Sequence, residues 1–359
     1  MSLPTHGANP HYFLKKLGVR TEKDVVDFSV NTNPLGSILD HHSLHLQELM
    51  MNYPDPNVTT LRQKLGETYD VSPHQVLVTN GAAEAFFLIA AHFSGKKALL
   101  LQPTFVEYKE ACEAFQCEVH SLQLKEKENW TWPFEQLMDL LPSMDIVWIC
   151  HPNNPTGMLY PNEQWELLLQ KAKQHDVTVV IDEAFFDFTE RAMRFESYIN
   201  DYPVIVVRSM TKMFHIAGIR LGYIFAAPSL ITALSMKQPP WSVNGVAQQV
   251  GEFCLENDEF VRQTVQFVGQ EREWVQKELH ALGLRTYPSF TNYYLCEIPK
   301  GWNGREWISY LAAAGVIVRH TENFQGLDGR YMRLAVKTRN ENERLLAVFR
   351  EGMAQRDLC

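Results

Sequence analysis

The stretch that decides the fold is Arg208-Ser209-Met210-Thr211-Lys212, followed shortly by Gly218-Ile219-Arg220-Leu221-Gly222-Tyr223. It comes directly after Val204–Val207, an apolar run typical of a buried strand. A lysine just past such a strand is desolvated, which lowers its pKa and leaves a neutral amine to attack an aldehyde. The neighbouring hydroxyls and the guanidinium of Arg220 suit a phosphate. A lone lysine here would more often be a surface loop residue, so the assignment depends on the wider pattern.

On either side of this stretch, short apolar runs alternate with amphipathic helical patterns. Buried strands separated by helices predict an α/β domain with a mostly parallel sheet. In such sheets, ligands bind where the strand ends give way to loops. The runs are Val76–Val78, Ala98–Leu101, Ile146–Cys150, Val177–Ile181, Val204–Val207 and Leu221–Ala226, with helices at Ala82–Phe93 and around Glu107–Phe115.

Three other strand ends carry residues of chemical interest. Asp182 could keep the nitrogen of a pyridine cofactor protonated, although an Asp there could equally cap the next helix. Asn154 lies in a Pro- and Gly-rich turn and could donate to a phenolic oxygen. Gly81-Ala82-Ala83 opens a helix, where backbone N–H groups and the helix dipole attract phosphate, although such turns are common.

The remainder of the chain predicts a second, smaller α+β unit. Residues 255–285 have the pattern of a long charged helix, and Pro239-Pro240-Trp241 marks a hinge region. We expect an N-terminal arm with part of the small domain in 1–44, a large cofactor-binding domain in 45–240, and an interdomain helix with the small C-terminal domain in 241–359. Short strands are expected at Tyr293–Cys296, Val316–Arg319 and Tyr331–Val336, and a terminal helix from Asn340.

Composition narrows the class of protein. The 359 residues are 45% hydrophobic and 21% charged, which is ordinary for a globular enzyme. A net charge of −9 argues against binding nucleic acid or anionic membranes, and no apolar run is long enough to span a bilayer. The six cysteines form no CxxC pair and no zinc spacing, so we expect reduced thiols, no metal site and a cytoplasmic location.

Together, the turn Asn153–Gly157 and the Ser-x-Thr-Lys…Gly-x-Arg-x-Gly-Tyr string resemble the pyridoxal-phosphate enzymes of fold type I, within the class I and II aminotransferases. The resemblance extends from about residue 27 to residue 340. It implies pyridoxal 5'-phosphate held by Lys212 as a Schiff base, with Asp182 at the pyridine nitrogen and Tyr108 stacked on the ring. It also implies that Tyr53 reaches the phosphate of a neighbouring subunit in a homodimer. The remaining cofactor contacts that it implies are Gly81, Ala82, Ala83, Asn154, Ser209, Thr211 and Arg220.

One position departs from the aminotransferase pattern. Many members have Tyr three residues after the Asp, where this chain has Phe185. The change leaves Asn154 as the main donor to the phenolic oxygen of the cofactor, and it weakens the expectation of transamination.

Longer strings resemble one branch of the family, the threonine-phosphate decarboxylases of cobalamin synthesis. These strings are His6–Asn9, Asp27–Gly36, Arg208–Lys212, Pro240–Asn244 and Val318–Tyr331. The resemblance implies decarboxylation of L-threonine O-3-phosphate to (R)-1-amino-2-propanol O-2-phosphate. The implied substrate contacts are His6, Asn33, Gly36, Asn154, Arg319 and Arg333.

Elementary chemistry favours arginines for such a substrate, because guanidinium forks suit phosphate and carboxylate groups. Arg319 and Arg333 are therefore the candidates for the two anions, although Arg319 could form a surface salt bridge and His6 could lie in a disordered terminus. The alternative enzyme is a histidinol-phosphate aminotransferase, which would share the fold, the cofactor and a phosphorylated substrate.

Overall fold

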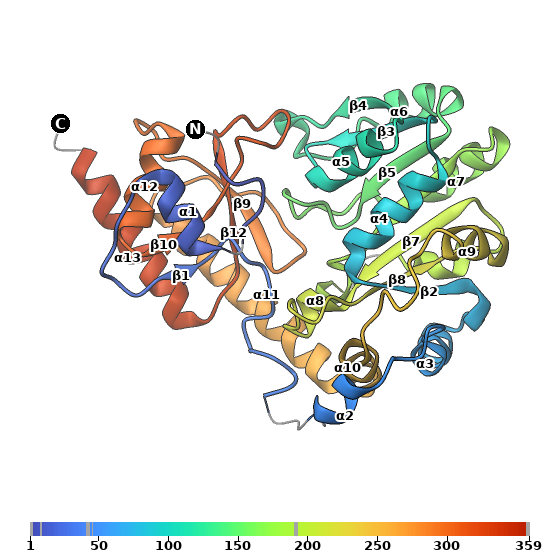
Figure 1. Ribbon diagram of the computed structural model, residues 1–359. Coiled ribbons are helices and arrows are strands. Elements are labelled where there is room, and N and C mark those ends of the chain that lie inside the picture. Colours follow the sequence, from blue (N-terminus) through green and yellow to red (C-terminus); the bar gives the residue numbers. More distant parts are fainter. Residues whose placement is uncertain (1–2, 8, 41–43, 45, 190–192, 357–359) are drawn as a thin grey trace.

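The computed structural model describes residues 3–7, 9–40, 44, 46–189 and 193–356, so Ala8 of the N-terminal string and Cys359 lie outside the described residues. The chain forms a larger and a smaller body side by side (Figure 1). The larger body is built on a seven-stranded sheet of order β2-β8-β7-β6-β5-β3-β4. Neighbouring strands are parallel, except that β8 runs antiparallel to both β7 and β2. The strands are β2 (Val76–Thr79), β3 (Lys97–Gln102), β4 (Glu118–Gln123), β5 (Ile146–Cys150), β6 (Thr178–Asp182), β7 (Val204–Ser209) and β8 (Gly222–Phe225).

Strand alternation divides the core of the larger body between the two faces of the sheet. On β5, Ile146 and Trp148 pack on one side, whereas Val147 and Ile149 pack on the other. This burial on both faces confirms the predicted mostly parallel α/β sheet. Helices α4 (Gly81–His92), α5 (Val106–Ala114) and α9 (Pro228–Ser235) cover the first face, and α3 (Thr59–Tyr69), α6 (Phe134–Leu140), α7 (Asn162–Gln174), α8 (Met210–Met213) and α10 (Gly245–Leu255) contribute to the second core.

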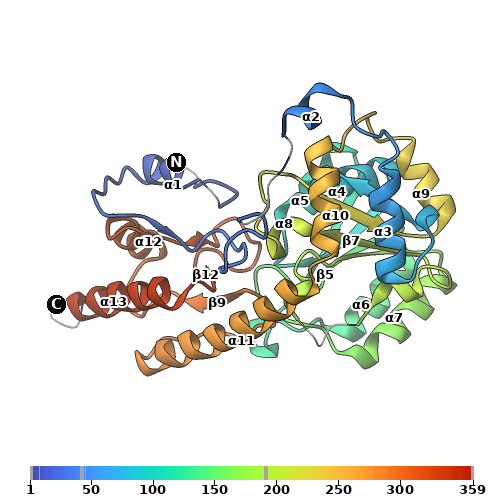
Figure 2. The same ribbon diagram turned by 90° about the horizontal axis from the view of Figure 1, so that it is seen from below.

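The smaller body unites the two ends of the chain. Its antiparallel sheet has the order β11-β12-β9, and β1 (Val26–Asp27) pairs in parallel with β10 (Val316–Ile317). Figure 2 shows α11 (Asp258–Ala281) running from beside α10 in the larger body to beneath the smaller one. The other elements are α1 (Pro10–Leu17), β9 (Tyr293–Glu297), α12 (Gly304–Ala313), β11 (Arg319–His320), β12 (Tyr331–Ala335) and α13 (Arg339–Arg356).

The predicted strands of the larger sheet match the observed ones to within about a residue at most ends. The strand expected at Val316–Arg319 is instead divided into β10 and β11, which pair in different sheets. The edge strand β4 was not predicted, because most of its side chains are partly or fully exposed and only Leu122 is buried. The long helix expected at residues 255–285 is α11, which begins after Asn257. The domain boundaries stay a prediction. Among the described residues, no helix combines the length and the apolar character needed to cross a bilayer.

A buried ion triad lies on the sheet face opposite Ser209. The guanidinium of Arg208 donates from Nε to Glu183 at 2.8 Å and from Nη2 to Glu196 at 2.9 Å. All three side chains are at most 4% exposed. Because successive strand residues point to opposite faces, Arg208 supports the sheet from behind while Ser209 faces the cavity described next.

Candidate active site

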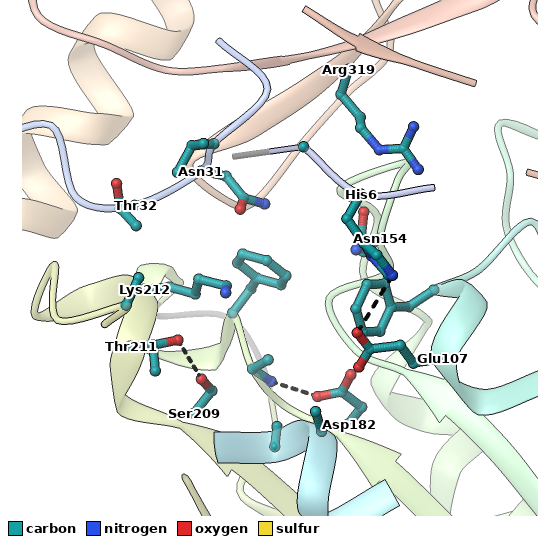
Figure 3. A pocket seen from close by; sticks show the side chains of 18 of the residues that line it. His6, Asn31, Thr32, Glu107, Asn154, Asp182, Ser209, Thr211, Lys212 and Arg319 are labelled. Atoms are coloured by element: carbon teal, nitrogen blue, oxygen red, sulfur yellow. Dashed lines mark hydrogen bonds and ion pairs between the residues drawn. The ribbon is translucent and has the colours of Figure 1, made fainter. Parts of the chain in front are cut away.

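A cavity of about 380 Å³ lies between the two bodies, at the carboxyl ends of the parallel strands (Figure 3). This is where ligands bind in open α/β sheets. The larger body contributes residues that follow four neighbouring strand ends: Glu107 after β3, Asn154 after β5, Asp182 on β6 and Lys212 after β7. The smaller body supplies the opposite wall, which includes Thr5, His6, Gly7, Asn31, Arg319, Phe324 and Arg333.

Lys212 lies in the short helix α8, directly after β7, and its side chain lines the cavity. Burial, helped by the charges of Arg220 and Arg333, lowers the pKa of Lys212 to about 8. Near neutral pH, a useful fraction of the amine is therefore deprotonated. Such a nitrogen can attack an aldehyde, which is the chemistry predicted for this residue.

Small residues and hydroxyls form a cup beside Lys212. The side chains of Ser209 and Thr211 lie 2.8 Å apart, and both line the cavity together with Arg220. Across from them, α4 begins at Gly81, so that Ala82 and Ala83 line the cavity at a helix N-terminus. Hydroxyls, a guanidinium and a helix N-terminus together make a site for a phosphate group.

The carboxylate of Asp182 is buried at the end of β6. Its Oδ1 accepts from the backbone N–H of Ala184 at 2.9 Å, and its Oδ2 accepts from the hydroxyl of Tyr108. Burial raises the pKa of Asp182 to about 6, and the hydrogen bond from Tyr108 opposes that rise. A cation or a protonated ring nitrogen placed against this carboxylate would keep it ionised.

Asn154 and Arg333 join the two bodies across the cavity. Nη1 of Arg333 donates to Oδ1 of Asn154 at 2.8 Å, and Nη2 donates to the carbonyl of Ser29 at 2.8 Å. Because its oxygen is committed to Arg333, Asn154 has its amide nitrogen left to donate to a ligand. Nε of Arg333 is buried and has no hydrogen-bond partner among the described residues.

Two arginines make the wall of the smaller body cationic. The side chain of Arg319 donates to the carbonyl of His320 at 2.7 Å, to Oδ1 of Asn323 at 2.8 Å and to the carbonyl of Thr5. Burial lowers the pKa of Arg319 to about 9, with a further contribution from Arg333, whose own pKa burial lowers to about 10. In the part of the chain that the structure describes, neither guanidinium has a carboxylate within 4.0 Å, so this wall calls for an anion.

Five predicted site residues lie outside the cavity lining. One is Gly81, the first residue of α4, which directly precedes the lining residues Ala82 and Ala83. Tyr108 is fully buried, with its ring stacked on that of Trp148 and the ring centroids 5.4 Å apart. Asn33 is also fully buried, and its amide donates to Thr264 and to the backbone of Met213 instead of facing the cavity. The other two are Gly36, which approaches Asp40, and Tyr53, which is 84% exposed and packs on Trp241.

Among the lining residues that the sequence analysis did not predict, Asn31 and Glu107 are of particular chemical interest. Asn31 is only 6% exposed, and its amide nitrogen has no hydrogen-bond partner among the described residues. Figure 3 shows this side chain pointing toward the centre of the site. Glu107 also lines the cavity, on the first turn of α5. Its signal in the sequence was its position after a strand end, one residue before Tyr108.

Comparison with known proteins gives one consistent family. The profile of the family described as "Aminotransferase class I and II" matches residues 23–349. Threonine-phosphate decarboxylase of Salmonella typhimurium is 33% identical over 365 residues, with 98% of each chain covered. The structure is similar to that of L-threonine-O-3-phosphate decarboxylase from Porphyromonas gingivalis, with a TM-score of 0.81, 28% identity, and 92% and 100% of the two chains covered. It is also similar to histidinol-phosphate aminotransferase from Clostridium acetobutylicum, with a TM-score of 0.83, 28% identity, and 90% and 98% covered.

Proposed function

Because the chain belongs to the aminotransferase class I and II family, whose members depend on pyridoxal phosphate, we propose that it decarboxylates L-threonine O-3-phosphate. The observation that carries the proposal is the pair Arg319 and Arg333. These buried guanidinium groups share one cavity, and neither has a carboxylate partner among the described residues. The substrate offers two anions, a phosphate and a carboxylate, to match them. The two similar proteins that are named as decarboxylases of threonine phosphate support the same reaction.

The residues of the cavity fit pyridoxal phosphate. Gly81 has φ +74°, and a Cβ at this position would lie 2.6 Å from Nη2 of Arg220, so the cup tolerates no side chain here. Ser209, Thr211, Arg220 and the start of α4 would hold the phosphate of the cofactor. The amine of Lys212 would attach the cofactor, and Asp182 would face its ring nitrogen. When bound, the cofactor supplies an electron sink for the pair of electrons released when a bond at the substrate Cα breaks.

The protein's own groups would choose which bond breaks. Arg319 and Arg333 would bind the phosphate and the carboxylate of the substrate. The position of the carboxylate would then be set by the arginine that binds it and not by the cofactor. The arginine that binds the carboxylate would thereby decide whether the bond from Cα to the carboxylate or the bond from Cα to its proton is presented for cleavage. Lys212 then delivers a proton from Nζ to Cα, which replaces the lost carboxylate. The product is (R)-1-amino-2-propanol O-2-phosphate, the side-chain unit used in cobalamin synthesis.

Phe185 supports this assignment over transamination. Its ring is 5% exposed, lines the cavity and packs edge-on against Tyr293 at 4.8 Å. Because a phenyl ring cannot donate a hydrogen bond, we assign the donor to the cofactor's phenolic oxygen to the amide nitrogen of Asn154. The competing function is a histidinol-phosphate aminotransferase, which the similarity to the Clostridium acetobutylicum enzyme keeps as the second candidate.

The decisive experiment supplies L-threonine O-3-phosphate without any 2-oxo acid and follows carbon dioxide over many turnovers. A decarboxylase continues, because its cofactor returns to the starting form in each cycle. A transaminase stops after one turnover, because its cofactor is left as the amine. If that happens, and histidinol phosphate with 2-oxoglutarate turns over instead, the proposal is wrong and the second candidate replaces it.

We propose further that the enzyme works as a homodimer in the cytoplasm. A group of apolar side chains is exposed around α2 (Leu46–Met51), with Met50 at 78% and Met51 at 76%. Tyr53 and Trp241 extend this group. Exposed apolar surface of this kind is typical of subunit interfaces. A second subunit on this surface would cover Tyr53, as expected if that side chain serves the neighbouring site.

A further inference from the structure

The N-terminal segment 3–7 lies along the smaller body, and its residues Thr5, His6 and Gly7 line the cavity. We call this segment the arm. On the smaller body, the arm is held through its backbone: Nε2 of His320 lies 2.7 Å from the carbonyl of Pro4, and Nδ2 of Asn323 donates to the carbonyl of Thr5 at 3.2 Å. Arg319 also donates to the carbonyl of Thr5. These contacts hold Pro4 and Thr5 on the smaller body.

The arm is seated closely against the chain below it. A Cβ added to Gly7 would lie 2.7 Å from both the carbonyl oxygen and the hydroxyl of Ser29. Such distances do not occur for real side chains, so the backbone needs glycine at this point. The backbone positions of Thr5 and Gly7 are both set by these contacts. They therefore determine where the side chain of His6, which lies between them, can reach.

The side chain of His6 reaches the larger body at Glu107. Nε2 of His6 lies 3.9 Å from Oε1 of Glu107, and its ring lies edge-on to Phe105 with ring centroids 6.2 Å apart. Figure 3 shows the pair above Asp182, with a dashed line between them. Glu107 is 21% exposed and lines the same cavity as Lys212 and Arg220. An unpaired carboxylate in a cavity that binds anions would repel an anionic substrate. Pairing with His6 would reduce this repulsion.

We propose that Glu107 is a positioning residue that ties His6 to the larger body and so holds the arm closed over the substrate. The inference rests on the proposed function and deepens it, because the closed arm keeps His6 and Arg319 facing the substrate anion. Glu107 would not touch the reacting atoms. It would act through His6, by pairing with the imidazole and by fixing which way the ring faces.

The charge of the pair changes with its surroundings. Burial lowers the pKa of His6, and Arg319 lowers it further, whereas Glu110 on the same helix raises it. Burial likewise raises the pKa of Glu107. Both shifts weaken the ion pair in the substrate-free enzyme, so we expect it to contribute only a small stabilisation there. A dianion arriving beside His6 favours the imidazolium, which then attracts Glu107 more strongly, so substrate and arm stabilise each other.

The test uses the cofactor-loaded enzyme and the variant Glu107→Gln, with Glu113→Gln as the matched control. Glu113 lies on the same helix, but it pairs with Lys109 at 3.6 Å and is 58% exposed, away from the cavity. In Glu107→Gln, hydrogen exchange of the amides of the arm should rise by about three- to fivefold, the loss expected for a partly exposed ion pair. KM for L-threonine O-3-phosphate should rise by a similar factor, while kcat changes less than about twofold. The control should change none of these.

A double-mutant cycle with His6→Ala separates pairing from a general loss of stability. Once His6 is absent, Glu107→Gln should have no further effect on exchange in the arm. Exchange or KM equal to the wild type in Glu107→Gln, or additive effects in the cycle, would overturn the inference. Failure of the proposed function is seen separately, because then no variant releases carbon dioxide, whereas the exchange measurement needs no substrate.

Discussion

The hydroxyl of Tyr108, a fully buried residue outside the cavity lining, donates a hydrogen bond to Oδ2 of Asp182. The same Oδ2 lies 3.9 Å from the thiol of Cys150, and Oδ1 accepts from the backbone of Ala184. Both oxygens of the carboxylate therefore have protein contacts. The sequence analysis expected Tyr108 to stack on the cofactor ring. In the structure, Tyr108 instead donates to Asp182, the carboxylate that would face the ring nitrogen.

Tyr108→Phe should move the pH dependence of cofactor binding upward. Asp182 must be ionised to bind a protonated ring nitrogen, so affinity is present above its pKa and is lost as the pH falls through it. Because the lost hydrogen bond had lowered that pKa from a value already raised to about 6, removing the bond raises it further. We expect a shift of about one pH unit, measured by titrating the apoenzyme with pyridoxal phosphate between pH 5 and about 8. Superimposable wild-type and variant curves would mean that the bond does not tune the carboxylate.

Lys212→Ala should abolish the visible absorbance of the enzyme–cofactor adduct. Without the amine there is neither the covalent link nor the proton donor to Cα, so turnover should fall by about three orders of magnitude or more. Absorbance spectra and steady-state release of carbon dioxide check both effects. A variant with full activity would exclude Lys212 as the cofactor lysine.

Asp182→Asn should separate cofactor binding from chemistry. The amide has nearly the same shape as the carboxylate, but it cannot hold the ring nitrogen protonated, so the electron sink is weakened. We expect kcat to fall by about two orders of magnitude or more while the cofactor remains bound, as judged by dialysis and absorbance. Normal turnover would leave the residue with the role of a local cap for the N–H of Ala184.

Arg208→Ala should destabilise the fold without touching the cavity. The change leaves Glu183 buried without its cation and Glu196 with only the exposed Arg194, which costs about 3–5 kcal/mol. Arg194→Ala removes a second partner of Glu196, but Arg194 is 61% exposed, so this control should cost less than about 1 kcal/mol. Urea unfolding, followed by circular dichroism, measures the free energy of unfolding of both variants. Equal decreases for Arg208→Ala and Arg194→Ala would show that the buried triad contributes no more than an exposed ion pair.

Tyr53→Phe and Lys212→Ala subunits should complement each other when mixed. If Tyr53 serves the neighbouring site, hybrid dimers contain one site damaged twice and one intact site. Activity should therefore recover to about a quarter of the wild-type value at equal mixing, if dimers form at random. Separately purified parents provide the baseline. A mixture no more active than the average of its parents, or a monomer at assay concentration, would contradict the shared site.

The sequence predicts some residues of the site and not others, depending on whether they follow a regular strand. Lys212, Asp182 and Asn154 were placed near one another because each follows a buried parallel strand, and such strands end at the same edge. Asn31 and Asn33 could not be told apart in the same way. They lie in an irregular segment, where neither the period of a strand nor that of a helix tells which side chain faces inward. Glu107 was missed because its partner, His6, is about a hundred residues away in sequence and meets it only in the folded chain.

The pairing of β1 with β10 has a consequence for how the protein is made. Val26 pairs with Val316, so the first strand leaves the ribosome long before its partner has been synthesised. The seven-stranded sheet lies wholly within residues 76–225 and can assemble during that interval, with its lysine and phosphate cup in place. The arginines at 319 and 333 arrive only at the end of translation. The newborn enzyme would thus be able to receive its cofactor before it could recognise a substrate.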